Sequence, residues 1–186
     1  MEKQDLASAL LKKQIRKEAW DNISRNYPLT ENMMLNFSDE LNREEISKNS
    51  SINWDAAMIR RLRYLIDWGV FSANATEEIL TEETLEMFKD RWDWSELSGN
   101  SNLALTYELI DKFIDRWDWE KLINGSSRRF RNTRHDKKTA VLNMAFFERY
   151  QQYIPVEDLE NSSLWSCIVD EEEEEIKKEL VTGGVQ

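Results

Sequence analysis

The residues of this sequence that could do chemistry are charged rather than nucleophilic. A basic cluster stands out because the whole chain is acidic, with a formal net charge of −11. Asp136 is the only acid within this cluster. Its members are Arg128, Arg129, Phe130, Arg131, Arg134, Lys137 and Lys138. Cations interleaved with an aromatic residue can bind a phosphate backbone or an acidic protein surface.

Acidic residues recur at two fixed positions of a repeated sequence pattern. Asp67, Asp93 and Asp118 occupy one position, and Asp90 and Asp115 occupy the other. If the copies stack, the carboxylates form columns that could bind a divalent cation or a basic partner. In the alternative, the first three residues cap short helices and the other two face solvent. We predict the second arrangement and no metal site, because capping needs one Asp in each copy whereas a metal site needs several ligands to converge.

Residue types that support catalysis are scarce. The chain has one histidine, His135, and one cysteine, Cys167, and they fall in different predicted elements. The sequence contains no glycine-rich phosphate loop and no Cys/His spacing that is typical of a metal site. We therefore expect a protein that is not an enzyme and that uses no cofactor.

Composition favours helices and argues against several cellular settings. Only five glycines and two prolines occur in 186 residues, so the turns that sheets require are in short supply. A single cysteine forms no internal disulfide, and no secretion leader is evident, which favours a cytoplasmic protein. No apolar stretch approaches the roughly 20 residues that cross a bilayer, and the acidic charge opposes binding to anionic lipid. We expect no membrane role.

Four copies of an apolar-Ser-x-Asn tetrad set the positions of these charged residues. Their serines are 23, 25 and 26 residues apart. The copies are Ile23–Asn26, Ile46–Asn49, Phe71–Asn74 and Leu97–Asn100, with a degenerate fifth at Leu122–Gly125. Three residues before four of the five copies stands a tryptophan, namely Trp20, Trp68, Trp94 and Trp119. A period of about 25 residues predicts repeated helical units.

Each full tetrad is followed by the signature of a helix start and an amphipathic helix. The candidate N-caps are Thr30, Asp55, Thr81 and Thr106. The residues three, four, seven and eleven positions after each cap are apolar, apart from Thr84, and form one stripe with helical period. We predict a long helix through each +11 residue, that is, Leu41, Ile66, Trp92 and Trp117. A shorter helix, capped by Asn or Asp, lies between successive long helices.

The best-preserved copies resemble a known kind of short helical repeat. The stretches Asp93–Ser98 and Leu109–Trp119 carry the resemblance, which extends over residues 20–125. Such repeats are seen in uncharacterised proteins of Bacteroidetes-like bacteria and of large DNA viruses, and they are loosely akin to ankyrin-type and tetratricopeptide-type solenoids. The resemblance implies an all-α repeat solenoid and leaves the function open, because such repeats scaffold many surfaces. The chain lacks the Thr-Pro-Leu-His motif of ankyrin units and the roughly 34-residue tetratricopeptide period.

The Ser and Asn of each tetrad have two interpretations. A ladder of these polar side chains could bind the backbone of a peptide. Alternatively, each Ser bonds the preceding helical turn and each Asn adopts a left-handed turn conformation, to which Asn is suited. We predict the second, structural role.

We expect a single domain with four parts. These are an N-terminal capping helix (1–19), four to five helical repeats (20–125), a basic insertion loop (126–138), and C-terminal helices with an acidic cap (139–186). Leu122 and the comparable Leu159 are 37 residues apart, which exceeds the period by about 12 residues. This insertion is either a binding loop or a flexible linker that neutralises the acidic surface. The C-terminal part carries an apolar stripe made of Leu164, Trp165, Ile168, Val169, Ile176 and Leu180.

The expected function is binding to a protein partner of unknown identity through a helical-repeat surface and the basic insertion. The alternative is an acidic inhibitor that mimics nucleic acid, as phage and mobile-element anti-defence proteins do, and blocks a nucleic-acid-binding enzyme. Its binding surface would consist of Asp90, Asp93, Asp115 and Asp118. The acidic run Asp170–Glu175 imitates a row of phosphates or is a solvated helix face.

Two further binding hypotheses remain. Direct nucleic-acid binding through the basic insertion is opposed by the acidic charge of the whole chain. If neither charged surface binds a partner, exposed aromatic side chains around Phe146, Phe147 and Tyr150 are the next candidates.

Overall fold

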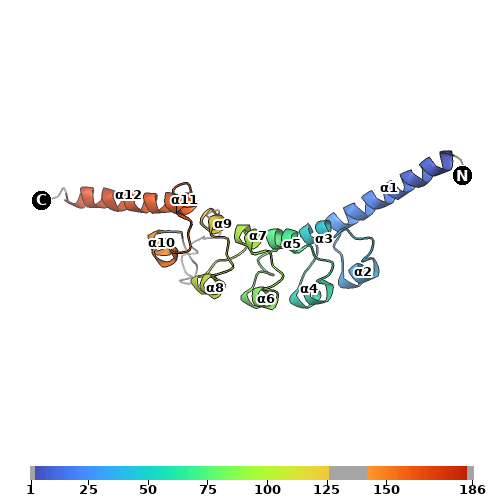
Figure 1. Ribbon diagram of the computed structural model, residues 1–186, viewed down its shortest axis with the longest axis horizontal. Coiled ribbons are helices and arrows are strands. Elements are labelled where there is room, and N and C mark those ends of the chain that lie inside the picture. Colours follow the sequence, from blue (N-terminus) through green and yellow to red (C-terminus); the bar gives the residue numbers. More distant parts are fainter. Residues whose placement is uncertain (1–2, 126–141, 184–186) are drawn as a thin grey trace. The chain divides into compact units, whose positions relative to one another are not determined.

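A computed structural model describes residues 3–125 and 142–183 of the chain. These residues form twelve helices and no β-strand, which confirms the all-α prediction (Figure 1). The chain separates into two compact units, residues 1–92 and residues 93–186.

The first unit arranges short helices in two rows. Its helices are α1 (Lys3–Asn26), α2 (Glu31–Asn36), α3 (Arg43–Lys48), α4 (Ala56–Leu62), α5 (Trp68–Asn74) and α6 (Glu82–Met87). Helix α3 packs against α1 on one side and α5 on the other, so the first three tetrads share one row. Helices α2, α4 and α6 form the other row in Figure 1, and α2 packs against α4.

The second unit begins with the same alternation of helices. Its helices are α7 (Trp94–Gly99), α8 (Tyr107–Lys112), α9 (Trp119–Ile123), α10 (Met144–Tyr150), α11 (Val156–Leu159) and α12 (Ser163–Gly183). Helix α7 packs against α9, and each of them carries a tetrad. Helix α10 packs against α12, so the C-terminal helices have their own contacts within this unit.

The predicted helix starts are confirmed. The N-caps of α2, α4, α6 and α8 are Thr30, Asp55, Thr81 and Thr106. Each of these side chains accepts a hydrogen bond from the backbone N–H three residues later, a group that has no partner within the helix. The helices α3, α5, α7 and α9 are capped in the same way by Asn42, Asp67, Asp93 and Asp118.

The helices that follow the first set of caps are shorter than predicted. They contain six or seven residues and end before the +11 position, so the prediction of a long helix is wrong. In α6 the end comes at Met87 because Phe88 leaves helical geometry, with φ −118° and ψ 22°. The N–H groups of Arg91 and Trp92 then donate to the carbonyl of Phe88 at 2.8 and 3.2 Å. This turn folds Trp92 back, and its indole N–H donates to the carbonyl of Thr84 at 3.4 Å.

The predicted apolar positions nevertheless form the core. The four +11 residues are all buried: Leu41, Ile66, Trp92 and Trp117. Aromatic pairs connect them to the helices that carry tetrads, since Trp68 lies 5.2 Å from Trp92 and Trp94 lies 5.1 Å from Trp117 between ring centroids. Both pairs are edge-to-face, a geometry that stabilises beyond simple burial. The first copy is less complete, because Phe37 is 44% exposed.

The two longest helices described are α1 and α12. Helix α1 runs without a break through the first tetrad, so the boundary expected at residue 19 falls inside one helix. In α12, Leu164 and Ile168 are buried, whereas Trp165, Val169, Ile176 and Leu180 are exposed, so only two residues of the predicted stripe are buried. Within residues 3–125 and 142–183, no helix is both long and apolar enough to span a membrane.

Candidate binding surface

The two charged surfaces expected from the sequence differ in how far the structure describes them. The basic cluster, residues 128–138, lies outside the described residues, as does His135 within it. The four acids of the alternative surface all lie within the described residues. Their contacts, and those of the tetrads, show which polar groups are already used in holding the helices together.

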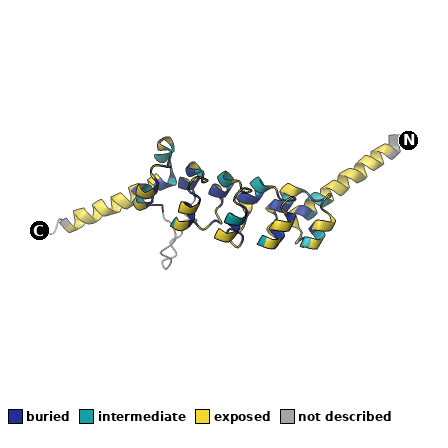
Figure 2. Ribbon diagram, turned by 60° about the horizontal axis from the view of Figure 1, so that its bottom comes forward, coloured by how far each residue is buried: buried dark blue, intermediate teal, exposed yellow. Residues whose placement is uncertain are grey.

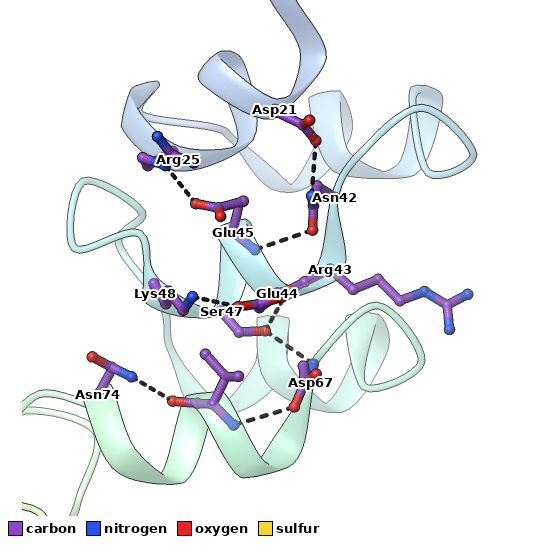
Figure 3. A network of polar contacts seen from close by, with 11 residues as sticks. Asp21, Arg25, Asn42, Arg43, Glu44, Glu45, Ser47, Lys48, Asp67 and Asn74 are labelled. Atoms are coloured by element: carbon purple, nitrogen blue, oxygen red, sulfur yellow. Dashed lines mark hydrogen bonds and ion pairs between the residues drawn. The ribbon is translucent and has the colours of Figure 1, made fainter. Parts of the chain in front are cut away.

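The tetrad serines link successive helices of the first unit. The hydroxyl of Ser47 donates to the carbonyl of Arg43 at 2.7 Å, one turn earlier in α3, as predicted. The same oxygen accepts a hydrogen bond from the N–H of Asp67, at the start of α5, at 2.9 Å (Figure 3). Ser24 in α1 accepts in the same way from the N–H of Asn42, at the start of α3, at 3.0 Å. These two serines are buried, so their hydroxyls serve the fold rather than a peptide ligand.

The second unit contains the same contact and extends it with charged groups. Ser98 in α7 accepts a hydrogen bond from the N–H of Asp118, at the start of α9, at 3.0 Å. The carboxylate of Asp118 accepts from the hydroxyl of Ser95 at 2.6 Å and from the N–H of Lys121 at 3.1 Å. The Lys121 ammonium donates to Glu96 at 2.9 Å, and this bond raises the pKa of the lysine. Asp118 is therefore half-buried and occupied by contacts within its own unit.

The Asn of the second tetrad does not adopt the predicted left-handed conformation. Asn49 has φ −74° and ψ 102°, and no residue in the described part of the chain has a positive φ. Its side-chain nitrogen donates to the carbonyls of Ser24 and Tyr27, both at 2.9 Å, and its oxygen accepts from the N–H of Ser51 at 2.8 Å. A primary amide can donate and accept hydrogen bonds at once. The Asn49 side chain therefore links Ser24 and Tyr27, at the end of α1, to Ser51 in the loop after α3. The left-handed prediction was wrong, and the predicted structural role is confirmed for Asn49.

Charged residues also connect α1 with α3. The carboxylate of Asp21 accepts from the side chain of Asn42 at 2.8 Å, and Arg25 donates to Glu45 at 2.6 Å (Figure 3). The hydrogen bond from Arg25 lowers the pKa of Glu45 from its ordinary value. The row of helices that carries the tetrads is thus held by polar contacts as well as by its core.

The acidic positions serve mainly as caps, as predicted. Asp93 caps α7 by accepting from the N–H of Glu96 at 3.0 Å. Asp90 and Asp115 lie exposed in the turns after α6 and α8. Among the residues that the structure describes, no three His, Cys, Asp or Glu side chains are grouped so that they could hold a metal ion.

A groove of about 370 Å³ opens in the first unit, where α3 and α5 end. It is lined by the carboxyl ends of these two helices and by the loops that follow them, within residues 47–54 and 71–79. Phe71 and Ile79 are buried in its floor, and the half-buried Trp54 meets Phe71 edge-to-face at 5.5 Å between ring centroids. The apolar floor therefore includes an aromatic side chain that remains partly accessible.

The rim of this groove is polar and electrically balanced. Lys48 and Glu78 are the charged residues of its lining, and exposed Asn53 and Thr76 lie among them. A hydrogen bond from Thr76 is the main cause that lowers the pKa of Glu78, so this carboxylate is ionised at neutral pH. A polar rim around an apolar centre is the usual anatomy of a protein interface, whereas a phosphate backbone is bound by an excess of cations.

The groove residues were not among the sites expected from the sequence. Their signal was the pair of loops that follow the second and third tetrads, Ser50–Trp54 and Ala75–Leu80, each of which brings apolar residues close to a helix end. The sequence placed these loops between helices, but it did not show that the two loops lie side by side.

The aromatic residues considered as exposed candidates are largely buried. Phe146 and Tyr150 are in the core of the second unit, so that suggestion is wrong for both. The hydroxyl of Tyr150 donates to Asp111 at 2.9 Å, and Arg149 donates to the other oxygen of this carboxylate at 2.5 Å. The guanidinium of Arg149 also lies 5.3 Å from the ring centre of Tyr107. This cluster joins α8 to α10 across the undescribed residues.

Acid is expected to weaken the contact between Asp111 and Arg149. The hydrogen bond from Arg149 lowers the pKa of Asp111, so its stabilising effect is complete above the unfolded-state pKa of about 3.9 and is lost as the pH falls through the lower folded-state pKa. The difference in unfolding free energy between the wild type and Asp111→Asn should therefore be constant above about pH 5 and shrink below about pH 4. Urea unfolding at a series of pH values measures this. In an Arg149→Gln background the shrinkage should be smaller, and a difference independent of pH in the wild-type background would contradict the assignment.

The single cysteine is not activated as a nucleophile. Cys167 lies half-buried in α12, and burial is the main cause that raises the pKa of its thiol, with Asp170 and Glu171 adding to the effect. A raised pKa keeps the thiol protonated at neutral pH, whereas the thiolate is the reactive form.

Comparison of the chain with protein-family models, with curated proteins and with solved structures finds no match.

Proposed function

We propose that this protein is a non-catalytic interaction module whose helical units of about 25 residues stack into a repeat solenoid and bind a protein partner. The observation that carries the proposal is the groove at the ends of α3 and α5, with its apolar floor and balanced polar rim. In this proposal the chain belongs with the short helical repeats that its sequence resembles.

The stacking part of the proposal is supported by contacts that recur between equivalent atoms. The same serine oxygen accepts from the same type of backbone N–H at Ser24, Ser47 and Ser98. A solenoid requires equivalent contacts between neighbouring repeats, because a repeat of about 25 residues is too small to bury its own apolar face. The caps and aromatic pairs recur in the same register.

The binding part of the proposal is supported by what the groove leaves accessible. The half-buried ring of Trp54 can pack against an apolar side chain, and Asn53 can donate to and accept from a peptide group. Glu78 offers a carboxylate at the rim, and the ammonium of Lys48 is ion-paired with Glu44 at 2.5 Å. A segment of a protein with mixed side chains fits this surface better than a polyanion does.

Blocking the groove is expected to abolish capture of the partner. The full chain, immobilised as bait, should retain a protein from a lysate of its native host. The double variant Asn53→Arg, Thr76→Arg places two long side chains in the rim and should reduce this retention by about tenfold or more, equivalent to about 1.4 kcal/mol. Binding of the partner by the wild type should change little between low and high salt, because the lining of the groove carries one charge of each sign.

The matched control adds the same two charges at exposed positions of α2, as Asn32→Arg, Asn36→Arg. This variant should bind like the wild type. Equal retention by the groove variant and by the control would exclude the groove as the binding site.

The second candidate function, an acidic inhibitor that mimics nucleic acid, is favoured by one observation. All six residues of Asp170–Glu175 are exposed on α12. An inhibitor of this kind should lose affinity steeply as salt rises.

Charge reversal at Asp90 and Asp115 tests the acidic surface without removing the caps Asp93 and Asp118. Replacement of Arg128, Arg129, Arg131 and Arg134 by serine tests the basic insertion in the same assay.

A further inference from the structure

The first half of α1 exposes a run of large apolar side chains. Leu6, Leu10, Leu11 and Ile15 are between 48% and 59% exposed, and Figure 2 shows this helix as exposed along most of its length. Leu6 and Leu10 are four residues apart, as are Leu11 and Ile15, so each pair lies on one side of the helix, and the two pairs face different sides. Single exposed apolar residues are ordinary on a protein surface, but four within ten residues are typical of a contact surface.

The same half of α1 is basic. Residues 6–17 contain Lys12, Lys13, Arg16 and Lys17 and no acid. Arg16 forms an ion pair with Glu40 at 2.7 Å, and the three lysines are exposed. The apolar side chains of α1 are therefore bordered by ammonium groups that face solvent.

Helix α12 has the opposite character on its exposed side. Its inner side packs on α10, where Leu164 and Ile168 are buried and Glu171 accepts from the N–H of Met144 at 3.1 Å. Outside this contact lies a second apolar stripe at helical spacing, made of Trp165, Val169, Ile176 and Leu180, which are between 38% and 73% exposed. Seven acids and two lysines lie within residues 170–181. This stripe is bordered by carboxylates.

We propose that two copies of this chain associate through α1 of one copy and α12 of the other. One apolar pair of α1, Leu11 and Ile15, packs against the apolar stripe of α12. The lysines of α1 lie beside the carboxylates of α12. Pairing of α1 with α1, or of α12 with α12, would bring like charges together and is disfavoured. Each chain offers one helix of each kind, so two copies can make two equivalent contacts, or successive copies can make an open chain. This association uses the terminal helices and does not depend on the groove.

A membrane surface is the competing ligand for α1 alone, since helices with exposed lysines and large apolar side chains can bind anionic lipid. Helix α12 would be repelled by that surface, because its exposed stripe is bordered by acids. A second copy accounts for exposed apolar side chains on both helices, which is why we favour it.

The oligomeric state of the full chain tests this proposal. Sedimentation velocity from about 1 to about 300 µM should show a mass that rises with concentration, and the apparent affinity should fall by about tenfold or more between low salt and about 0.5 M salt. Reversing the α1 charges, as Lys12→Glu, Lys13→Glu, Lys17→Glu, should abolish association. Reversing three α12 charges, as Glu172→Lys, Glu173→Lys, Glu179→Lys, should do the same.

The decisive sample is an equal mixture of the two charge-reversed variants. Neither should associate alone, but together they restore opposite charges at both contacts and should form a complex. The control Arg43→Glu, Arg60→Glu, Arg63→Glu changes the charge of exposed residues elsewhere by the same amount and should associate like the wild type. Circular dichroism verifies that each variant keeps its helices.

Three outcomes of the sedimentation experiments would overturn the proposal. They are a wild-type chain that stays monomeric throughout the concentration range, charge-reversed variants that still associate alone, and a mixture that fails to form a complex. Binding of the monomeric wild type to vesicles rich in phosphatidylserine, lost in the α1 variant, would assign α1 to a membrane and would equally overturn it.

Discussion

Replacement of Trp117 by alanine is expected to lower the free energy of unfolding by about 3 to 5 kcal/mol. The side chain is buried, meets Trp94 edge-to-face at 5.1 Å between ring centroids, and also contacts Phe113. Its indole N–H donates to the carbonyl of Ile110 at 3.1 Å, near the end of α8, where helix carbonyls lack partners within the helix. Truncation therefore leaves a cavity and also removes the donor to this carbonyl.

Urea unfolding followed by circular dichroism measures the loss for Trp117→Ala. Tyr64→Ala is the control, because Tyr64 is an aromatic residue that is 50% exposed, and its loss should cost less than about 1 kcal/mol. Equal midpoints for the Trp117 variant and the wild type would show that this side chain is not part of the core.

Asn49→Ala is expected to cost about 2 to 3 kcal/mol, although it removes a small polar side chain. Alanine leaves the carbonyls of Ser24 and Tyr27 and the N–H of Ser51 without the partner that Asn49 provides. Buried polar groups that lose a partner keep the cost of leaving water, which is larger than the net gain from an ordinary hydrogen bond. The same urea experiment measures this loss.

The third tetrad offers a matched control for this substitution. Asn74 occupies the equivalent position, but it is exposed and donates to the carbonyl of Val70 in its own helix at 2.8 Å. Asn74→Ala should change the unfolding free energy by no more than about 0.5 kcal/mol. If both asparagine variants lose the same stability, the contacts of Asn49 with the preceding helix contribute nothing of their own.

Local sequence signals predicted the helix starts well, because a cap acts over three residues. Thr81 and Asp118, for example, accept from the N–H three residues later and need no distant partner. Helix ends were less predictable, because the apolar spacing continues from Phe88 to Trp92 whether the chain stays helical or turns. The turn that follows Phe88 buries Trp92 in the core, which is where a continuous helix was expected to place it.

The polar contacts show where sequence reasoning stops. The role of Ser47 toward its own helix was predictable, since it is one turn from Arg43. Its second bond, to the N–H of Asp67, crosses 20 residues and depends on how α3 and α5 pack. The groove could not be predicted from the sequence, because it forms only where the loops after α3 and α5 lie side by side.

The serine contacts have a consequence for which mutations the chain tolerates. In each of them the donor is a backbone N–H, at Asn42, Asp67 or Asp118, so the bond survives an exchange between Asn and Asp at that position. Proline alone among the standard residues lacks this donor. The serine contact therefore leaves the capping side chain free to vary among residues that can cap, except where that side chain has a further partner, as Asn42 has in Asp21. It excludes proline at the cap and requires a hydroxyl at the tetrad serine. Sequence drift at these helix starts should be asymmetric, with the acceptor position more constrained than the donor position.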